Sequence, residues 1–411
     1  MERVTSRAAV AVTGLGLVTP AGHDDESIWK TMAAGRSLAR KDPELADLPV
    51  DISCRVTGFD PVDELGLRLA SRLDRFAHLG LVAARRAVAD AGLDISACPE
   101  RVAVVLGVGA NSLQTYVAEF TRLGQGRPTS VSPLGLPRSV PSMVAGEVAI
   151  DTGARGPNFT VSSACASGTT AIGVARDLLL SGACDVVLTG GSESARARMS
   201  AACFAQMRAL STRTEHPEQA CRPFDTDRDG FVLGEGAALL VLERADHARS
   251  RGAHVRAWLR GYGASADAHH PTSPHPEGLG AEQAVRQALA DADCTPRDVG
   301  HVNAHGTATR LGDTAEALAL LRVFTGAPPV VTASKSIVGH ALGAAGAIEA
   351  ALTVLALERQ EVLPTANLGQ QDTGRQMDIV TCRPRAVGFD VALSTSFGFG
   401  GQNAALVLAA P

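Results

Sequence analysis

Short apolar segments alternate along the chain with longer stretches in which apolar residues recur at helical spacing. The short segments predict strands and the longer stretches predict helices. The predicted strands span residues 8–12, 102–108, 159–162, 185–189, 237–242, 255–261, 302–304, 330–332, 391–395 and 404–408. The predicted helices span residues 73–91, 166–180, 281–292, 314–324 and 344–357. This alternation is typical of an α/β fold with mostly parallel sheets.

The domain organisation follows from what the chain lacks between these elements. It has no Pro- or Ser-rich linker and no block of like charge, so we expect one compact body. One series of strands and helices ends near Ser250, and another begins at Val255. We therefore expect two halves, residues 1–250 and 251–411.

Composition narrows the class of protein. The 411 residues are 45% apolar, 20% charged and 4% aromatic, with a net charge of -5. These values predict a globular protein and argue against a nucleic-acid-binding surface. There is no extended apolar run and no signal-peptide core, so we expect no membrane partner. The eight cysteines show neither C-x-x-C nor Cys/His ligand spacing, which indicates reduced thiols in the cytoplasm and no metal site.

Two short motifs mimic ligand sites. Asp225-x-Asp227-x-Asp229 begins like a calcium loop, but its twelfth position is Gly236 and not glutamate. Residues 14–16, Gly-Leu-Gly, lack the third glycine of a dinucleotide fingerprint. We expect neither calcium nor a dinucleotide to bind.

Cys165 lies between a predicted strand and a predicted helix and is flanked by small residues that leave room for a ligand. A thiol at a helix N-terminus faces unpaired N–H groups and the positive end of the helix dipole. We therefore expect the pKa of Cys165 to be lowered and its sulfur to be a nucleophile. Taken alone, the residue fits a buried structural cysteine as well.

Two histidines change that balance, because each follows a predicted strand. His305 comes after the strand at 302–304, and His340 after the strand at 330–332. Chemistry in open α/β sheets gathers at the carboxyl ends of strands, so we expect both rings beside Cys165. A Gly-rich turn at residues 394–403 allows close backbone approach and could aim an N–H at an oxyanion.

Six motifs, in their order and spacing, resemble the β-ketoacyl-acyl-carrier-protein synthase II and type II polyketide ketosynthase group of the thiolase superfamily. They are Val12-Thr13-Gly14-Leu15-Gly16, Ser163-Ala164-Cys165-Ala166-Ser167-Gly168, Arg222-Pro223-Phe224-Asp225 through Gly236, the His305 loop, Lys335 to His340, and Gly398-Phe399-Gly400-Gly401. The resemblance implies a duplicated thiolase-like α/β fold in five layers, αβαβα. The first half would carry the nucleophile and the second half the two histidines.

The reaction that the resemblance implies is decarboxylative Claisen condensation. An acyl group passes from an acyl carrier protein to Cys165, malonyl-carrier protein loses carbon dioxide, and the carbanion attacks the thioester, which lengthens the chain by two carbons. His305 and His340, as neutral imidazoles, would each donate an N–H to the developing oxyanion. No cofactor would be bound tightly, because the carrier protein supplies the phosphopantetheine arm.

The resemblance also implies supporting roles. Lys335 would hydrogen-bond within the site, and we expect it to pair with Glu316. Asp313 shares a helix face with Glu316, although a solvated surface position for Asp313 stays open. The backbone N–H groups of Cys165 and Phe399 would hold the tetrahedral oxyanion, and the Phe399 side chain would gate access. The remaining residues are Thr307, Thr309 and Thr272 for the pantetheine arm, Ala110 and Phe204 for the acyl pocket, and Arg68, Arg72, Arg127 and Arg208 for carrier-protein docking.

Rival functions remain at this point. A degradative thiolase would need a second cysteine near the C-terminal Gly-rich turn, and residues 396–401 contain none. An initiating synthase would have asparagine in place of His340. A non-catalytic chain-length subunit generally lacks the nucleophile, which Cys165 supplies here.

The pathway is also open between polyketide synthesis and primary fatty-acid elongation. Three departures from the fatty-acid enzymes favour a polyketide ketosynthase that works as a heterodimer with a chain-length partner. They are Arg310 in place of the usual proline, Ala110-Asn111-Ser112 in place of an Ile-Gly-Gly-like stretch, and Gln402 after the Gly-rich turn. A homodimeric 3-oxoacyl synthase II of fatty-acid elongation is the alternative.

Overall fold

The strands join edge to edge in one path, β12-β10-β9-β14-β15-β8-β1-β7-β6-β4-β5, within a computed structural model that describes residues 10–110, 113–372, 374 and 376–411. The strands of the first half are β1 (Val10–Val18), β4 (Val102–Gly107), β5 (Asn158–Val161), β6 (Val186–Ser194) and β7 (Leu233–Arg244). Those of the second half are β8 (Ala257–Ala266), β9 (Val299–Asn303), β10 (Val330–Thr332), β12 (Asp378–Ile379), β14 (Val391–Gly398) and β15 (Gln402–Ala409). Four two- or three-residue strands lie at the margins: β2 (Arg40–Lys41), β3 (Ile52–Cys54), β11 (Glu361–Val362) and β13 (Arg385–Ala386).

The two halves repeat one topology. The spatial order β5-β4-β6-β7-β1 in the first half matches β10-β9-β14-β15-β8 in the second, strand for strand in chain order. In these orders β7 and β15 each run antiparallel to the strand on either side, and β4 and β9, the second strand of each order, pair in parallel with the strand on either side. The expected duplicated α/β fold is therefore confirmed. The boundary at residue 250 stays a prediction; it falls between the end of α10 (Ala245–Ser250) and β8.

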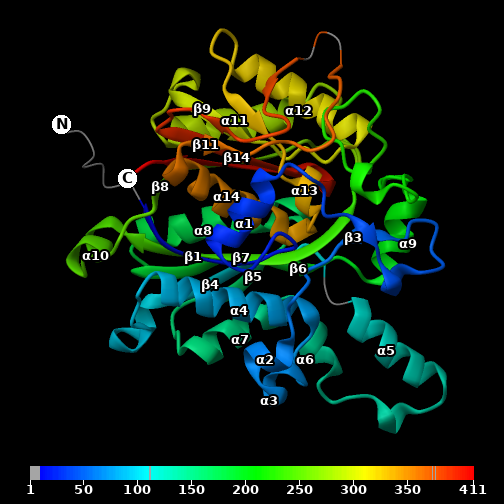
Figure 1. Cartoon of the computed structure of the whole chain (residues 1–411). Helices are drawn as coiled ribbons and strands as arrows, with labels where there is room; N and C mark the ends of the chain where they lie inside the picture. The colour runs from blue at the N-terminus through cyan, green and yellow to red at the C-terminus, as the bar shows by residue number, and fades with distance from the viewer. Residues whose placement is uncertain (1–9, 111–112, 373, 375) are drawn as a thin grey trace.

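Helices and sheets alternate in five layers (Figure 1). One outer layer contains α4 (Arg75–Asp90) and α7 (Ser142–Thr152), and the other contains α11 (Leu279–Asp291) and α12 (Arg310–Val323). The middle layer is formed by α8 (Ser167–Leu180) and α14 (Ala345–Arg359), with α1 (Asp25–Ala33) and α13 (Lys335–Val338) beside them. Shorter or peripheral helices are α2 (Pro61–Leu65), α3 (Leu67–Ala70), α5 (Leu113–Gly124), α6 (Gly135–Ser139) and α9 (Arg198–Gln206).

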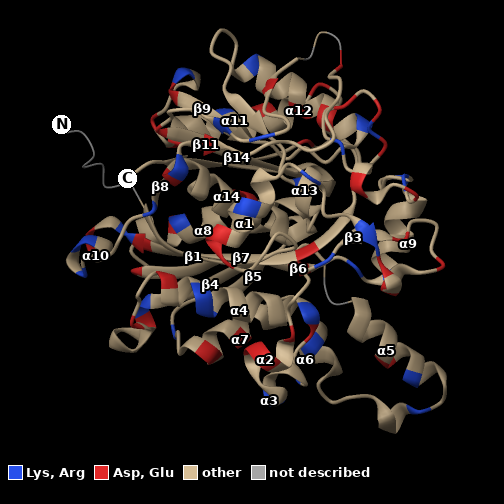
Figure 2. Cartoon of the chain, in the orientation of Figure 1, with Lys and Arg blue, Asp and Glu red and all other residues tan. Residues whose placement is uncertain are grey.

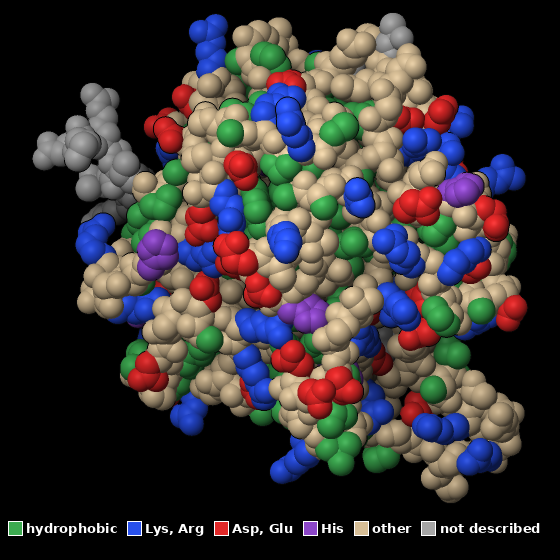
Figure 3. All heavy atoms as spheres, in the orientation of Figure 1, with side chains coloured by type: hydrophobic (Ala, Val, Ile, Leu, Met, Phe, Trp, Pro, Cys, Tyr) green, Lys and Arg blue, Asp and Glu red, His purple; other side chains and the backbone are tan. Residues whose placement is uncertain are grey.

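The middle layer is possible because α14 is apolar on every side. All of its residues from Ala345 to Leu357 are buried, and apart from the polar Glu349 and Thr353 most of these side chains belong to one hydrophobic cluster with strands of both halves. A helix that is hydrophobic all round must be enclosed, so α14 belongs between the sheets. The charged side chains visible on the surface mix both signs over the face in view (Figures 2 and 3).

Glycines on β1 and β8 let a helix lie against each strand. A Cβ added at Gly16 would lie 2.0 Å from the carbonyl oxygen of Ala83 on α4. A Cβ added at Gly263 would lie 2.1 Å from the carbonyl oxygen of Ala284 on α11. Because only glycine fits such an approach, the Gly-Leu-Gly sequence serves strand–helix packing.

All ten predicted strands and all five predicted helices are present over the residues that the structure describes, with ends that differ by a few residues. The sequence analysis missed several elements, including α1, α5, α7 and α9. α5 projects from the body in Figure 1, and its described side chains include none that is buried.

Candidate active site

One cavity of about 600 Å³ brings together side chains from both halves of the chain. Cys165 from the first half lines it with His305, His340 and Phe399 from the second. Phe204, predicted for the acyl pocket, also contributes, and its ring centroid lies 6.1 Å from that of Phe399. The cysteine and the two histidines therefore face a common space.

Cys165 lies on a tight turn between β5 and α8. The turn is a short 3₁₀ segment, Ala164–Ala166, and Ala164 has a positive φ of 50°. A non-glycine residue in this region is strained, which is a feature that clusters at functional sites. Cys165 is only 8% exposed.

The expected lowering of the Cys165 pKa is wrong. Burial raises the pKa of this thiol to about 11, although the Lys335 charge and the backbone N–H groups of Phe399 and Cys165 oppose the rise. The cost of charging a buried sulfur thus exceeds the help of the helix terminus. The thiol is protonated near pH 7, and the two N–H groups that act on its sulfur are the pair expected to form the oxyanion hole.

Both histidines are neutral and carry their proton on Nε2. Nδ1 of His305 lies 3.2 Å from the Lys335 ammonium, and Nδ1 of His340 accepts the N–H of Leu342 at 3.2 Å. Each Nδ1 faces a donor, so the hydrogen resides on Nε2. Burial, helped by the charge of Lys335, lowers the pKa of both rings well below 6.5. The ring centroids are 5.5 Å apart, which leaves two N–H donors close together.

Lys335 pairs with Glu349 and not, as expected, with Glu316. Its Nζ donates to Oε1 of Glu349 at 2.5 Å and to the backbone oxygen of His305 at 2.6 Å. Both members of the ion pair are nearly inaccessible to solvent, at 1% and 2%. Lys335 thereby ties the His305 loop to α14 in the middle layer.

Glu316 holds the His305 loop through its backbone instead. Its two carboxylate oxygens accept the N–H groups of His305 and Gly306, each at 2.8 Å, and Oε1 also accepts the Thr395 hydroxyl. Because these donors occupy the Glu316 carboxylate, it does not form an ion pair with Lys335. Glu316 is a positioning residue for His305.

Asp313 performs the matching task one turn earlier on α12. Its carboxylate accepts the N–H groups of Thr307 at 3.0 Å and Ala308 at 3.1 Å, and that of Phe224 at 2.6 Å. With 1% exposure it is not the solvated surface residue that the sequence left open.

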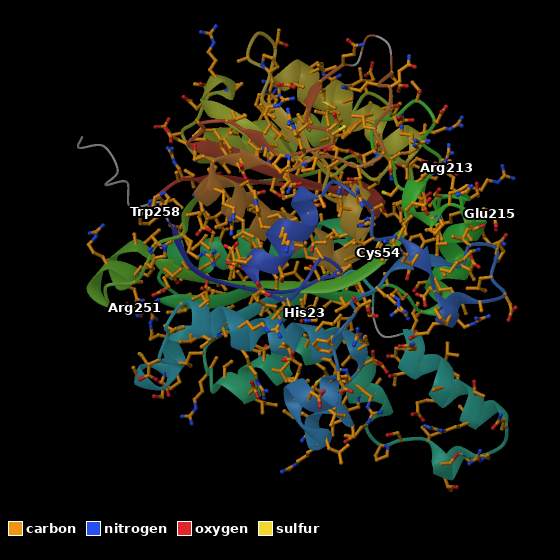
Figure 4. The ribbon with its side chains drawn as sticks, in the orientation of Figure 1. His23, Cys54, Arg213, Glu215, Arg251 and Trp258 are labelled. Atoms are coloured by element: carbon orange, nitrogen blue, oxygen red, sulfur yellow. The ribbon has the colours of Figure 1, made fainter. Side chains whose placement is uncertain are left out.

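Glu316→Gln should lower both stability and activity. The amide places an NH₂ group against backbone N–H donors, and a buried donor without an acceptor costs about 1–3 kcal/mol. We expect the free energy of unfolding to fall by this amount, and the reaction in which His305 takes part to slow because the His305 ring shifts. Denaturant unfolding and steady-state rates measure both effects. Glu215→Gln is the control, since Glu215 is 88% exposed at the edge of the molecule (Figure 4); an equal loss in the control would contradict the assignment.

The other predicted residues divide into two groups. Thr272, Thr307, Thr309 and Arg208 line the cavity, and the Thr307 and Thr309 hydroxyls lie 3.0 Å apart. The residues that do not line it are Ala110, Arg68, Arg72 and Arg127. Arg68 and Arg127 are exposed, whereas Arg72 approaches Glu147 at 3.6 Å. Their docking role stays a prediction.

Ala110 contacts a residue that the sequence analysis missed. Its N–H and that of Gly109 donate to Oε2 of Glu193, each at 2.8 Å. Asn111 and Ser112, which belong to the same departure from the fatty-acid enzymes, lie outside the described residues. The influence of Ala110 on the acyl pocket therefore stays a prediction.

The sequence offered one sign that Glu193 and Glu349 are buried. Each is an acidic residue within an apolar or small-residue stretch, where a charge is costly unless it is paired. Burial raises the pKa of Glu193 to about 8 and that of Glu349 to about 7. Such isolated acids were the available sign of a buried polar network.

The aspartates of the calcium-like motif have structural partners. Asp225 accepts the N–H groups of Gly369 and Gln370, and Asp229 accepts the Ser211 hydroxyl. No group of three or more His, Cys, Asp or Glu side chains that could hold a metal ion occurs in residues 10–110, 113–372, 374 and 376–411. A search of the same residues finds no helix long and apolar enough to cross a membrane.

A duplicated α/β fold in which one thiol shares a cavity with two neutral imidazoles defines a thiol-dependent, acyl-transferring condensing enzyme. Comparisons with known proteins agree with this class. The family model "Beta-ketoacyl synthase, N-terminal domain" matches residues 7–248, and "Beta-ketoacyl synthase, C-terminal domain" matches residues 256–369. The chain belongs to the beta-ketoacyl synthase family.

Similar proteins of known name and structure cover nearly the whole chain. The 3-oxoacyl-[acyl-carrier-protein] synthase 2 of Vibrio harveyi is 40% identical over 98% of both chains, and that of Staphylococcus aureus (strain COL) is 40% identical over 97% of both. A beta-ketoacyl synthase from Burkholderia phymatum STM815 superposes with a TM-score of 0.93 at 34% identity, covering 98% of this chain and 100% of its own. The ishigamide ketosynthase/chain length factor superposes with a TM-score of 0.91 at 32% identity, covering 99% and 100%.

Proposed function

We propose that this protein is a β-ketoacyl-acyl-carrier-protein synthase that extends an acyl chain by decarboxylative condensation with a malonyl unit. The observation that carries the proposal is the pair of Nε2–H donors of His305 and His340 in the cavity of Cys165. Two neutral donors suit an enolate, because they stabilise negative charge without themselves supplying a readily lost proton.

The first step transfers the acyl group. The Cys165 sulfur attacks the acyl thioester while the backbone N–H groups of Cys165 and Phe399 stabilise the tetrahedral oxyanion. The carbon–sulfur bond to the pantetheine thiol breaks, and that thiol takes up the proton which Cys165 loses. Since the pKa of Cys165 is raised, proton loss accompanies the attack and does not precede it.

The second step forms the new carbon–carbon bond. The malonyl carboxylate leaves as carbon dioxide, and its bonding electron pair moves into an enolate whose oxygen accepts the two Nε2–H bonds. The enolate carbon then attacks the acyl thioester on Cys165, the carbon–sulfur bond breaks, and the departing thiolate takes a proton from water. The product is a 3-oxoacyl thioester on the carrier.

We propose an acyl carrier protein as the partner that delivers both substrates on a phosphopantetheine arm. Thr272, Thr307 and Thr309 line the cavity and can hydrogen-bond to the amides of such an arm. A structural relative is described as a type II polyketide acyl-carrier protein in complex with its ketosynthase, and it superposes with a TM-score of 0.90 at 29% identity. The arm accounts for the chemistry without a resident cofactor.

For the pathway, we propose a type II polyketide synthase in which this chain works with a chain-length partner. Two structural relatives are described as ketosynthases with their chain length factors. α5 offers an apolar surface to a partner chain, with Phe120 65% and Leu123 52% exposed, and β5 ends the strand path with Phe159 37% exposed. Exposed apolar side chains of this kind are ones that a second subunit would cover.

Primary fatty-acid elongation by a homodimer is the second candidate. It is favoured by the 40% identity to the 3-oxoacyl-[acyl-carrier-protein] synthase 2 proteins. A second copy of this chain would then cover the same surface.

Product analysis tests the proposal. Purified protein is incubated with malonyl-carrier protein and a panel of acyl-carrier proteins, with and without a candidate partner subunit, and the products are identified by mass. We expect 3-oxoacyl products that are two carbons longer than the acyl donors. Repeated extension that requires the partner supports the polyketide pathway, whereas single extension by a homodimer, shown by light scattering, supports fatty-acid elongation. The absence of any 3-oxoacyl product would contradict the proposed function.

A further inference from the structure

Two arginines stand at the exposed side of the catalytic cavity. Arg208 and Arg310 line it and are both exposed, so their guanidinium groups meet a molecule as it enters. Arg208 follows α9, and Arg310 is the first residue of α12. The family resemblance sets Arg310 apart, because it implies proline at this position in the fatty-acid enzymes.

The backbone places the two arginines on opposite sides of one short segment. The N–H of Gly230 donates to the carbonyl of Ala308 at 2.9 Å, and the N–H of Phe231 donates to the carbonyl of Ala209 at 3.0 Å. Residues 229–231 therefore separate the Arg208 turn from the Arg310 turn by the width of a single backbone. Nε of Arg310 donates to the carbonyl of Arg228 at 3.4 Å, which directs the side chain toward that segment.

Arg208 and Arg310 form no ion pair within the part of the chain that the structure describes. The three acidic side chains that line the cavity have other partners: Asp229 accepts the Ser211 hydroxyl at 2.7 Å, Asp267 accepts the N–H of His275 at 2.9 Å, and Glu316 accepts the N–H of His305 at 2.8 Å. No described carboxylate forms an ion pair with Arg208 or Arg310. The cavity entrance thus carries two unpaired cations.

Helix stability does not account for Arg310. A cation at the first position of α12 meets the positive end of the helix dipole, and proline would be preferred there. An unfavourable charge that packing does not require points to a ligand.

We infer that Arg310, together with Arg208, binds the phosphodiester of the phosphopantetheine arm as the arm enters the cavity. The inference rests on the proposed function. The arm carries one phosphate between its amide portion and the carrier protein, and planar guanidinium groups hydrogen-bond phosphate oxygens in pairs. Of the cavity threonines, Thr307 is buried, so the amides of the arm would follow toward it.

The test compares three acyl donors that differ only in the carrier: acyl-pantetheine without phosphate, acyl-phosphopantetheine, and acyl-carrier protein. For each donor, KM and kcat of acyl transfer to Cys165 are measured in wild-type protein, Arg310→Ala and Arg310→Lys. We expect Arg310→Ala to raise the ratio of KM for acyl-phosphopantetheine to KM for acyl-pantetheine about tenfold, as loss of one charge-assisted bond implies. Arg310→Lys should restore part of the ratio, and acyl-carrier protein should follow the phosphorylated donor.

Arg297→Ala is the matched control, because Arg297 is exposed, has no ion pair within the described ranges and does not line the cavity. Its ratio should equal that of the wild type. An unchanged ratio in Arg310→Ala overturns the inference, and so does a loss confined to acyl-carrier protein, which would assign Arg310 to the carrier surface instead. If wild-type protein takes no acyl group from any donor, the proposed function fails as well.

Discussion

Cys165→Ala is expected to abolish acyl transfer to the protein while decarboxylation of malonyl-carrier protein continues. Among the described residues that line the cavity Cys165 supplies the one thiol, so transfer should fall by about 10⁴-fold or more. The donors that stabilise the enolate, Nε2–H of His305 and of His340, belong to other elements and are untouched by the change. The two half-reactions should therefore separate.

Intact-protein mass measures the first half-reaction, and release of labelled carbon dioxide measures the second. Cys203→Ala is the control, since this exposed thiol on α9 does not line the cavity. Retention of an acyl adduct in Cys165→Ala would place the nucleophile elsewhere. Loss of decarboxylation along with acylation would contradict the division of labour between the thiol and the histidines.

The duplication was expected from the family resemblance and not from any repeat in the sequence, because it is preserved in geometry and not in residue identity. Gly14 and Gly16 on β1 meet Ala87 and Ala83 of α4, just as Gly261 and Gly263 on β8 meet Ala288 and Ala284 of α11. Each pair of contacts needs only a missing Cβ on the strand and a small residue on the helix. Two strands and two helices can satisfy that requirement in otherwise unrelated sequences, so periodicity revealed the elements but not their equivalence.

The reactive residues of the candidate site were predictable, because their types and their positions after predicted strands are visible in the sequence. Cys165, His305 and His340 each follow a strand, and the strand ends converge. The partner of Lys335 was not predictable in the same way. Glu316 is close in sequence to the His305 loop, but backbone N–H donors occupy its carboxylate, and Glu349 reaches Lys335 only through the packing of α14.

The direction of the Cys165 pKa shift was not predictable from the sequence either. Position at a helix N-terminus is visible in the sequence, whereas burial is a property of the folded chain. At 8% exposure the cost of desolvating the thiolate is the larger effect, and it reverses the expected direction.

Lys335→Met should destabilise the protein by about 3–5 kcal/mol at pH 8, because Glu349 stays buried without its partner and must either remain charged there or take up a proton at a cost that grows with pH. Much of the lost stability should be recovered in Lys335→Met/Glu349→Gln, where no buried charge remains. Denaturant unfolding of the wild type, both single variants and the double variant gives the four free energies of a double-mutant cycle. Equal stability of Lys335→Met and Lys335→Met/Glu349→Gln would contradict the ion pair.

The stability deficit of Lys335→Met should also depend on pH. Burial already raises the pKa of Glu349 to about 7, and removal of the Lys335 charge, which opposes this rise, raises it further. A group with a raised pKa in the folded state binds its proton more tightly there than in the unfolded chain, so stability falls as pH rises toward the folded value. We expect a smaller deficit at pH 6 than at pH 8, and no such trend in the double variant.

Activity should not recover with stability in the double variant. His305 would still lack the ammonium that faces Nδ1 and holds its ring and proton in place, so decarboxylation should remain about 10²-fold or more below the wild type. Carbon dioxide release at matched folded fractions separates this effect from unfolding. Nitrogen NMR of the His305 ring gives an independent readout, with Nε2–H dominant in the wild type and a mixture of the two neutral tautomers in the double variant. If decarboxylation returned together with stability, Lys335 would serve the fold alone.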